Sequence, residues 1–302
     1  MKPITVVGSY LTGQTMRVGR LPRRGETVTG SGYVEVPGGK GSNQAIAAKR
    51  LGASVRFVGC IGGDERGDAA MEMWKAEGIG TELVRRSSTP TGLGFVMVDP
   101  AGANSIAIDP GANLELSVDD VAKADSAIAG SGVVLLQLEV PRKTMEAAAR
   151  SGKAHGATVI LNPAPVMDAV GLTLTEVDIV TPNEEEFRLL TGTDDFEAGA
   201  RKLLALGPRA VVVTMGERGA RVVTKEDSYG VPAPEVRAVD TTGAGDAFNG
   251  ALAVALSEGE PLRQAVNFAC HAGALSVTRP EVVASLPTRA ELDEFIRNDV
   301  LE

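Results

Sequence analysis

The residue types best suited to chemistry in this 302-residue chain stand in one run, Asp240–Asp246, with the sequence Asp-Thr-Thr-Gly-Ala-Gly-Asp. Gly243 and Gly245 let the backbone turn tightly and approach a ligand without hindrance from a Cβ atom. A helical pattern follows, so we expect the amides of Gly243, Ala244, Gly245 and Asp246 to point out of a helix N-terminus. Such an end attracts anions, including a phosphoryl group in transfer. Asp246 could accept a proton from an attacking hydroxyl, or it could only cap the helix.

A second glycine-containing segment, Pro37–Ala45, also precedes a helical pattern. Gly38 and Gly39 would bring backbone amides close to a polar ligand. Lys40 and Asn43 could then contact the oxygens of that ligand. The alternative is a glycine-rich turn in which Lys40 is solvated.

Two further turns carry polar groups after buried strand-like runs. Asn183 and Glu186 stand one helical turn apart and could both reach a metal–phosphate site. The alternative is a plain helix start, where acidic residues are favoured by the helix dipole. Thr214-Met215-Gly216 is consistent with a nucleotide-binding turn and equally with a plain strand end.

Several common catalytic signatures are absent from the sequence. A phosphate-binding loop ends in Gly-Lys-Ser/Thr, but Lys40 is followed by glycine and Lys153 by alanine. No Gly-x-Gly-x-x-Gly follows the first strand-like run, which excludes the dinucleotide fingerprint. Only His155 and His271 are present, and no cysteine cluster lies beside them, so we expect no zinc site.

These segments lie at the ends of strand-like runs that alternate with helical patterns along nearly the whole chain. This alternation predicts an α/β fold with a mostly parallel sheet covered by helices on both faces. The expected strands are Ile4–Ser9, Val55–Ile61, Val133–Leu138, Val159–Leu161, Ile179–Val180 and Val211–Thr214. The expected helices are Asn43–Leu51, Asp64–Glu77, one from Pro141, Glu184–Leu190, Ala198–Leu206, Ala244–Ser257, Leu262–Thr278 and Thr288–Arg297.

Two helix-free stretches, at about 12–36 and 92–109, interrupt the alternation. The first contains period-two runs, and the second has the pattern of a hairpin that turns at Asp99-Pro100-Ala101-Gly102. Packed together, they would form a small β-lid over the strand ends, and a lid shields a substrate from water. The alternative is an edge extension of the main sheet.

Composition and charge limit the classes of partner. The formal net charge is −9, which disfavours nucleic acid and anionic membranes because both require clustered Lys and Arg. The longest apolar runs are too short to span a bilayer. Cys60 and Cys270 form no disulfide framework. We therefore expect a cytoplasmic protein without a nucleic-acid or membrane partner.

Taken in order and spacing, these motifs resemble the ribokinase / phosphofructokinase-B family of sugar and nucleoside kinases over essentially the whole chain. Gly38 to Asn43 is similar to the N-terminal signature of that family, and Asp240–Asp246 is similar to its highly specific C-terminal signature. The segments Gly25–Gly30, Gln137–Glu139, Leu161–Pro165, Thr181–Glu186 and Val213–Gly216 are also similar to ribokinase segments. The resemblance implies a ribokinase-like three-layer α/β fold in a single kinase domain over residues 1–302, with the β-lid described above. It also implies ATP-dependent phosphorylation of a hydroxyl on a small sugar such as a pentose.

The resemblance also implies roles for individual residues. Asp246 would be the catalytic base, and the amides of Gly243, Ala244, Gly245 and Asp246 would form the anion hole. The implied substrate contacts are Gly39, Lys40, Asn43 and Glu139, with Asp246; the implied ATP contacts are Asn183, Thr214 and Gly216. Glu186 would help to organise Mg²⁺, whereas Asp240, Thr242 and Ser285 would belong to a site for a monovalent cation such as K⁺. Because relatives often dimerise through the lid, we expect a homodimer.

Two departures from the family pattern bear on specificity. Ribokinases carry an Asn-x-Asp after Gly8-Ser9 that contacts sugar hydroxyls, whereas this chain has Leu11-Thr12-Gly13. In the cation loop, the family usually has a Gly-Ala pair where this chain has Glu281-Val282. The first departure leaves open a nucleoside or deoxysugar kinase of the same fold. A non-catalytic sugar- or nucleotide-binding regulator would have a damaged base or anion hole, yet these residues are all present.

Overall fold

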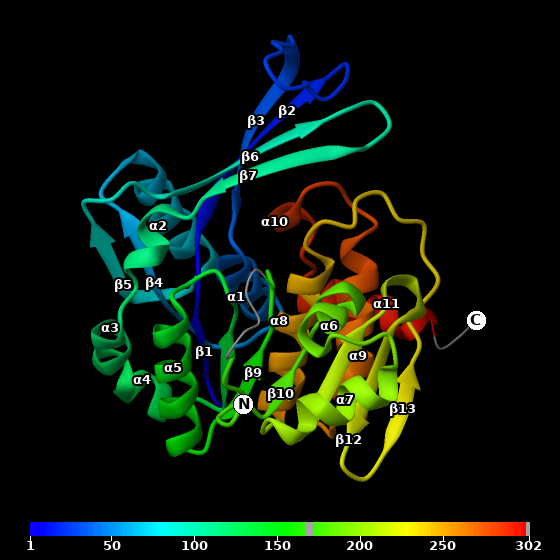
Figure 1. The fold of residues 1–302 in the computed structure, drawn as a ribbon. Coiled ribbons are helices and arrows are strands. Elements are labelled where there is room, and N and C mark those ends of the chain that lie inside the picture. The colour runs from blue at the N-terminus through cyan, green and yellow to red at the C-terminus, as the bar shows by residue number, and fades with distance from the viewer. Residues whose placement is uncertain (167–171, 300–302) are drawn as a thin grey trace.

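The computed structural model describes residues 1–166 and 172–299, which are built around one large β-sheet (Figure 1). Within these ranges the sheet has nine strands in the order β13-β12-β11-β10-β9-β8-β1-β4-β5. Neighbours from β11 to β5 are parallel, and β12 and β13 add an antiparallel edge. The strands are β1 (Ile4–Val7), β4 (Val55–Gly62), β5 (Gly80–Ser87), β8 (Val133–Leu136), β9 (Thr158–Leu161), β10 (Ile179–Val180), β11 (Ala210–Thr214), β12 (Ala220–Thr224) and β13 (Ser228–Val231).

Helices cover both faces of this sheet. Two separate apolar clusters, one on each face, are made mainly of Val, Leu, Ile and Ala side chains that alternate along the strands. One face is covered by α1 (Lys40–Arg50), α2 (Glu65–Glu77), α8 (Ala244–Glu258), α9 (Leu262–Ser276) and α11 (Arg289–Asp299). The other is covered by α3 (Val118–Lys123), α4 (Asp125–Ala129), α5 (Arg142–Ala154), α6 (Glu184–Thr191) and α7 (Phe196–Ala205). The predicted α/β fold with both sheet faces covered is thus confirmed.

Some helix boundaries differ from the prediction. The difference that bears on the site is the start of α1. We predicted a start at Asn43, but α1 begins at Lys40 and its N-cap is Gly39. The helix extends because the Asn43 amide already donates to the Gly39 carbonyl, at 2.9 Å. As predicted, α2 is capped by the Asp64 side chain and ends at a left-handed Gly78.

The two helix-free stretches form a second, separate four-stranded sheet, here called the β-layer. Its strand order is β3-β2-β6-β7, with β2 (Leu11–Val18), β3 (Gly30–Gly38), β6 (Gly92–Val98) and β7 (Asn104–Asp109). The β-layer projects beyond the strand ends of the main sheet, above the short helix α10 (Val282–Ser285) (Figure 1). The structure therefore does not have the edge extension that the sequence left open. Among the described residues, no helix has the length and apolarity to cross a bilayer.

Candidate active site

The predicted site residues gather at the carboxyl ends of the parallel strands. Ser9 follows β1, Glu139 follows β8 and Asn183 follows β10, while the N-termini of α1 and α8 point to the same edge (Figure 1). In open α/β sheets, ligands bind at this edge.

The turn before α1 is shaped by glycine and capped by Glu139. Gly39 has φ 91°, and a Cβ atom there would lie 2.7 Å from the Tyr10 Cα, so only glycine fits. Glu139 Oε2 accepts a hydrogen bond from the Lys40 amide at 2.8 Å and another from the Ser9 hydroxyl. One carboxylate oxygen of Glu139 therefore stabilises the start of α1, which adds a structural role to the predicted substrate contact.

Asp246 lies in the first turn of α8 and is buried, with 6% of its surface exposed. Asp246 Oδ1 accepts from Gln44 Nε2 at 3.0 Å, and Oδ2 accepts from Asn43 Nδ2 at 2.9 Å. No side chain caps α8, so within the described residues the helix-cap interpretation of Asp246 is wrong. Burial raises the pKa of Asp246, while Lys40, Asn43 and Gln44 act in the opposite direction. Asp246 is thus a partly desolvated carboxylate whose affinity for a proton exceeds that of an ordinary aspartate.

Lys40 lies among three carboxylates, those of Asp246, Glu139 and Glu186. Burial lowers the pKa of its ammonium group, but the attraction of these three carboxylates outweighs burial and leaves the pKa raised. Lys40 therefore carries its charge across the physiological pH range.

Asn43 has a buried polar atom without a partner. Among the described residues, its Oδ1 has no hydrogen-bond donor, although the side chain is only 5% exposed. An unsatisfied buried acceptor costs about 1–3 kcal/mol. Since Asn43 Nδ2 donates to Asp246, this free oxygen lies beside the carboxylate, where a substrate hydroxyl would satisfy it.

The glycine turn before α8 presents fewer free amides than we predicted. Gly243 has φ 83°, and a Cβ atom there would lie 2.5 Å from Val282 Cγ1. The Ala244 amide donates to the Thr241 carbonyl, and the Asp246 amide donates to the Gly243 carbonyl. In the part of the chain that the structure describes, the amides of Gly243 and Gly245 have no acceptor, so two of the four predicted donors are available to an anion.

Two of the predicted nucleotide residues lie side by side, Asn183 beyond the end of β10 and Thr214 at the end of β11. Asn183 and Thr214 form a parallel β-bridge, and the Thr214 amide donates to the Pro182 carbonyl at 2.9 Å. Asn183 and Glu186 form a capping box for α6, with both bonds at 2.8 Å. Burial raises the pKa of Glu186, and the Lys40 charge opposes that shift, which places Glu186 within electrostatic reach of the site. Gly216, with φ 58°, begins the short 3₁₀ turn η2 (Gly216–Arg218) after β11.

The predicted cation loop is held by Asp240. Asp240 Oδ1 accepts from the Thr242 amide at 2.9 Å, and Oδ2 accepts from the Glu281 amide at 3.2 Å. Glu281 has φ 66° and ψ 160°, a conformation essentially confined to glycine. The buried Ser285 hydroxyl donates to the Val282 carbonyl at 2.8 Å. The described residues include no cluster of three or more His, Cys, Asp or Glu that could hold a metal ion.

The root of the β-layer has one face toward α2 and the other away from it. The Tyr10 ring packs on the Trp74 ring of α2 at a centroid distance of 5.3 Å, and Glu35 pairs with Arg66 of α2 at 3.5 Å. Side chains alternate along a strand, so Leu11 and Gly13 belong to the opposite face. That face lies on the side of α10, which β3 contacts (Figure 1).

Apolar residues make up this second face. Leu11 Cδ1 lies 3.3 Å from where a Cβ atom of Gly38 would be and 3.5 Å from where one of Gly94 would be, so its side chain covers two glycines. Gly13 pairs with Val36 on one neighbouring strand and with Gly94 on the other. Ile108, in turn, pairs with Gly94 and is exposed. Thus no hydrogen-bonding side chain stands at Leu11 or Gly13.

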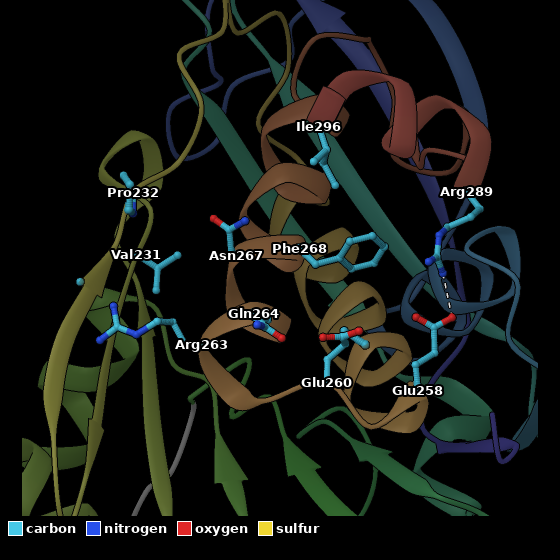
Figure 2. Close-up of a pocket in the computed structure, with 12 residues that line it drawn as sticks. Val231, Pro232, Glu258, Glu260, Arg263, Gln264, Asn267, Phe268, Arg289 and Ile296 are labelled. Atoms are coloured by element: carbon cyan, nitrogen blue, oxygen red, sulfur yellow. Dashed lines mark hydrogen bonds and ion pairs between the residues drawn. The ribbon is translucent and has the colours of Figure 1, made fainter. Parts of the chain in front are cut away.

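A cavity of about 480 Å³ lies at the other end of α8 (Figure 2). Glu258, Phe268 and Arg289 are among its lining residues, and an ion pair of 2.8 Å joins Glu258 to Arg289. Ala255 is the lining residue of α8 nearest to Gly243, so about 18 Å of helix separates this cavity from Gly243. The cavity is therefore distinct from the candidate active site.

Sequence reasoning assigned no role to several buried polar residues beneath Asp246. Gln44, Gln137, Asn162 and Asn249 are all at most 6% exposed, and each donates or accepts a side-chain hydrogen bond there. The available signal was a set of amide side chains within otherwise apolar, buried segments, since buried polar groups normally have partners.

Among the described residues, the head of α8 thus combines a buried carboxylate, two amides without an acceptor and a charged lysine, groups chemically suited to accepting a proton and to contacting an anion. The model of the family described as pfkB family carbohydrate kinase matches residues 1–289, and the chain belongs to this family. The protein is accordingly a sugar kinase, a phosphotransferase with an alcohol group as acceptor.

Individual relatives agree with this assignment. The chain is 39% identical to a ribokinase of Haemophilus influenzae over 98% of this chain and 99% of the relative. It is 35% identical to a deoxyribokinase of Salmonella typhi over 97% and 98% of the two chains. The structure of Arabidopsis thaliana ribokinase complexed with ribose and ATP matches with a TM-score of 0.89 and 32% identity, covering 98% of this chain and 99% of the other. The predicted ribokinase-like fold is thus confirmed.

Proposed function

We propose that this sugar kinase transfers the γ-phosphoryl group of ATP to a hydroxyl of a pentose or a closely related sugar, with Asp246 as the general base. One observation carries the proposal: Asp246 is buried at the head of α8 beside two amides and an Asn43 Oδ1 atom that have no hydrogen-bond partner among the described residues. The related ribokinases and the ribose- and ATP-bound Arabidopsis structure support the choice of substrates.

The proposed reaction assigns each group a step. The substrate hydroxyl donates a hydrogen bond to Asp246, which takes its proton as the oxygen bonds to the γ-phosphorus. The bond from that phosphorus to the bridging oxygen breaks, and ADP leaves with the electron pair. The amides of Gly243 and Gly245 and the charge of Lys40 stabilise the negative charge on the transferring group. Substrate oxygens contact Gly39, Lys40, Asn43 and Glu139.

On the nucleotide side, Asn183, Thr214 and Gly216 line the proposed ATP site. The half-buried carboxylate of Glu186 suits Mg²⁺, which keeps several waters and binds through one or two carboxylates together with phosphate oxygens. When bound, Mg²⁺ would neutralise charge on the phosphate oxygens. Glu186 would act by orienting a water in its hydration shell.

The apolar face of the β-layer bears on the identity of the sugar. Leu11 offers no hydrogen bond, and Gly13 leaves space, so a sugar hydroxyl held against them would lose its water without gaining a partner, at a cost of about 1–3 kcal/mol. We therefore propose that D-ribose is not the best substrate. The preferred acceptor would lack a hydroxyl at this position or carry an apolar group there.

Four further features belong to the proposal. The β-layer would act as a lid on one kinase domain, and K⁺ would bind near Asp240, Thr242 and Ser285. Large exposed apolar side chains on both faces of the β-layer, such as Phe95 and Ile106, support a homodimer through this layer; a native mass twice that of one chain tests this. The buried free thiols suit a reducing compartment such as the cytoplasm.

A coupled assay of ADP release tests the proposed function directly. The purified enzyme would be offered ribose, 2-deoxyribose, fructose and several nucleosides with ATP and Mg²⁺, and Asp246→Asn would serve as the control for contaminating kinases. We expect turnover with at least one furanose sugar that the variant loses. Absence of sugar-dependent ADP release with every acceptor would contradict the proposal.

A further inference from the structure

A network of buried amide and hydroxyl side chains lies directly beneath Asp246. Its members come from two helices and from the segments after three neighbouring strands, and each is at most 6% exposed. They are Gln44 of α1, Gln137 after β8, Asn162 after β9, Thr181 after β10 and Asn249 of α8. None of these five side chains is among the residues proposed above to contact sugar, ATP or metal.

The first arm of the network ends on the carboxylate. Gln137 Nε2 donates to Gln44 Oε1 at 2.6 Å, and Gln44 Nε2 donates to Asp246 Oδ1 at 3.0 Å. A carboxylate can only accept, so Gln44 must turn its amino group toward Asp246 and its oxygen toward Gln137. Gln137 must then donate. The charge of Asp246 therefore sets the direction of both bonds, and the bond from Gln137 holds the Gln44 amide in that orientation.

The second arm runs from the same glutamine to the glycine turn of α8. Gln44 Nε2 also donates to Asn162 Oδ1 at 3.1 Å, and Asn162 Nδ2 donates to the Thr181 carbonyl at 3.1 Å. The Thr181 hydroxyl donates to Asn249 Oδ1 at 2.6 Å, and Asn249 Nδ2 donates to the Gly245 carbonyl at 2.8 Å. The network thus connects the base with the first turn of the helix that presents the free amides.

Gly8 leaves room for the Gln137 side chain at the outer end of the first arm. A Cβ atom on Gly8 would lie 2.2 Å from Gln137 Oε1, so only glycine at that position leaves room for the glutamine. Among the described residues, Gln137 Oε1 has no donor. A buried acceptor without a donor is unfavourable. Gln137 therefore donates to Gln44 through Nε2 while its Oε1 atom stays unsatisfied.

We propose that Gln44, oriented by Gln137, is a positioning residue that holds the Asp246 carboxylate in the plane required for proton abstraction. Two fixed donors, Asn43 on one oxygen and Gln44 on the other, leave the carboxylate no freedom to rotate. Pre-orientation of this kind supports catalysis because a misplaced base loses rate even when substrate binding is intact. The inference rests on the proposed role of Asp246 as the base.

Charged groups around Asp246 determine how the network affects proton affinity. Burial raises the pKa of Asp246, Lys40 lowers it, and the donations from Asn43 and Gln44 lower it further; Glu139 raises it. Glu186 also repels Asp246. Loss of the Gln44 donor removes a bond to the charged form, so the pKa rises. Because the base acts when deprotonated, the acid limb of the rate profile then moves to higher pH.

The test compares Gln44→Met, which keeps the shape but not the donor, with Gln137→Met, which removes the group that orients Gln44. We expect kcat to fall at neutral pH while KM for ATP changes little. We also expect the acid limb of kcat to move up by about one pH unit in Gln44→Met, as for one lost bond to a charged group, and by less in Gln137→Met. Thermal unfolding and nucleotide binding would establish that each variant is folded. If Gln44→Met does not fold, the position of the acid limb of kcat in Gln137→Met tests the inference.

Ser131→Ala is the matched control. It removes a buried hydrogen bond of 2.8 Å to Thr5, at the end of β1 away from the site, and should lower the thermal midpoint without moving the acid limb. If the acid limb of the kcat profile stays at the same pH in both glutamine variants, whether or not kcat falls, the inference is overturned. If Asp246→Asn kept full activity, the proposed base would fail instead, so the two failures are distinguishable.

Discussion

Around Asp246, polar side chains from several elements are joined by hydrogen bonds, whereas around Leu11 the contacts are apolar, with the leucine side chain lying over two glycines. The first region is buried in the main sheet and its helices, and the second is the root of a four-stranded layer with exposed apolar residues. Many coupled bonds make the geometry of the base hard to change without loss. An apolar contact surface, in contrast, can change one side chain at a time and alter which sugar fits.

Removal of the base should have the largest effect of all. Asp246→Asn keeps the shape of the side chain but cannot accept the substrate proton, so kcat should fall by ~10²–10⁴, or roughly 3–5 kcal/mol of barrier. ATP affinity, measured by calorimetry, should change little. Turnover within a few-fold of the unmodified enzyme would show that Asp246 is not the base.

The β-layer should instead control which sugar is chosen. The double change Leu11→Asn and Gly13→Asp adds two polar side chains on the face toward α10, so a ribose hydroxyl there would gain partners. The ratio of kcat/KM for ribose to that for 2-deoxyribose should rise by about tenfold, since one such bond changes discrimination by about 1–3 kcal/mol. Phe95→Ser, on the opposite face, is the matched control and should leave the ratio unchanged. An unmodified enzyme that already prefers ribose tenfold or more would contradict the proposed specificity.

The same contrast explains what could be predicted from sequence. The Asp240–Asp246 run, the Gly39-Lys40 turn and the strand–helix alternation are local patterns, and the structure brings the first two together at the strand ends. The network of Gln44, Gln137 and Asn162 joins residues up to 118 positions apart, and no local pattern encodes such pairing. The start of α1 was missed for a similar reason, because the Lys40 amide donates to Glu139, which lies 99 positions further along the chain.

K⁺ should stimulate the reaction, with a smaller effect than loss of the base. A cation near Asp240 and the Thr242 carbonyl would strengthen the positive field at the adjacent glycine turn, where negative charge develops. Rates at matched ionic strength should be higher in K⁺ than in Na⁺ or Tris. Equal rates in the three buffers would remove the cation site from the proposal and would assign Asp240 to holding the loop alone.

Glu281 should show the smallest effect, on stability rather than on rate. Its conformation, φ 66° and ψ 160°, costs a non-glycine residue about 1–3 kcal/mol, and Asp240 helps to hold it by accepting from its amide. Glu281→Gly removes that strain but adds about 0.5–1 kcal/mol of chain entropy to the unfolded state. The net result should be a gain of about 1 kcal/mol in the free energy of unfolding, measured by urea denaturation. Glu281→Ala, which keeps a Cβ atom, should gain nothing, so equal stabilisation by both variants would show that the side-chain charge, and not the backbone, is the unfavourable element.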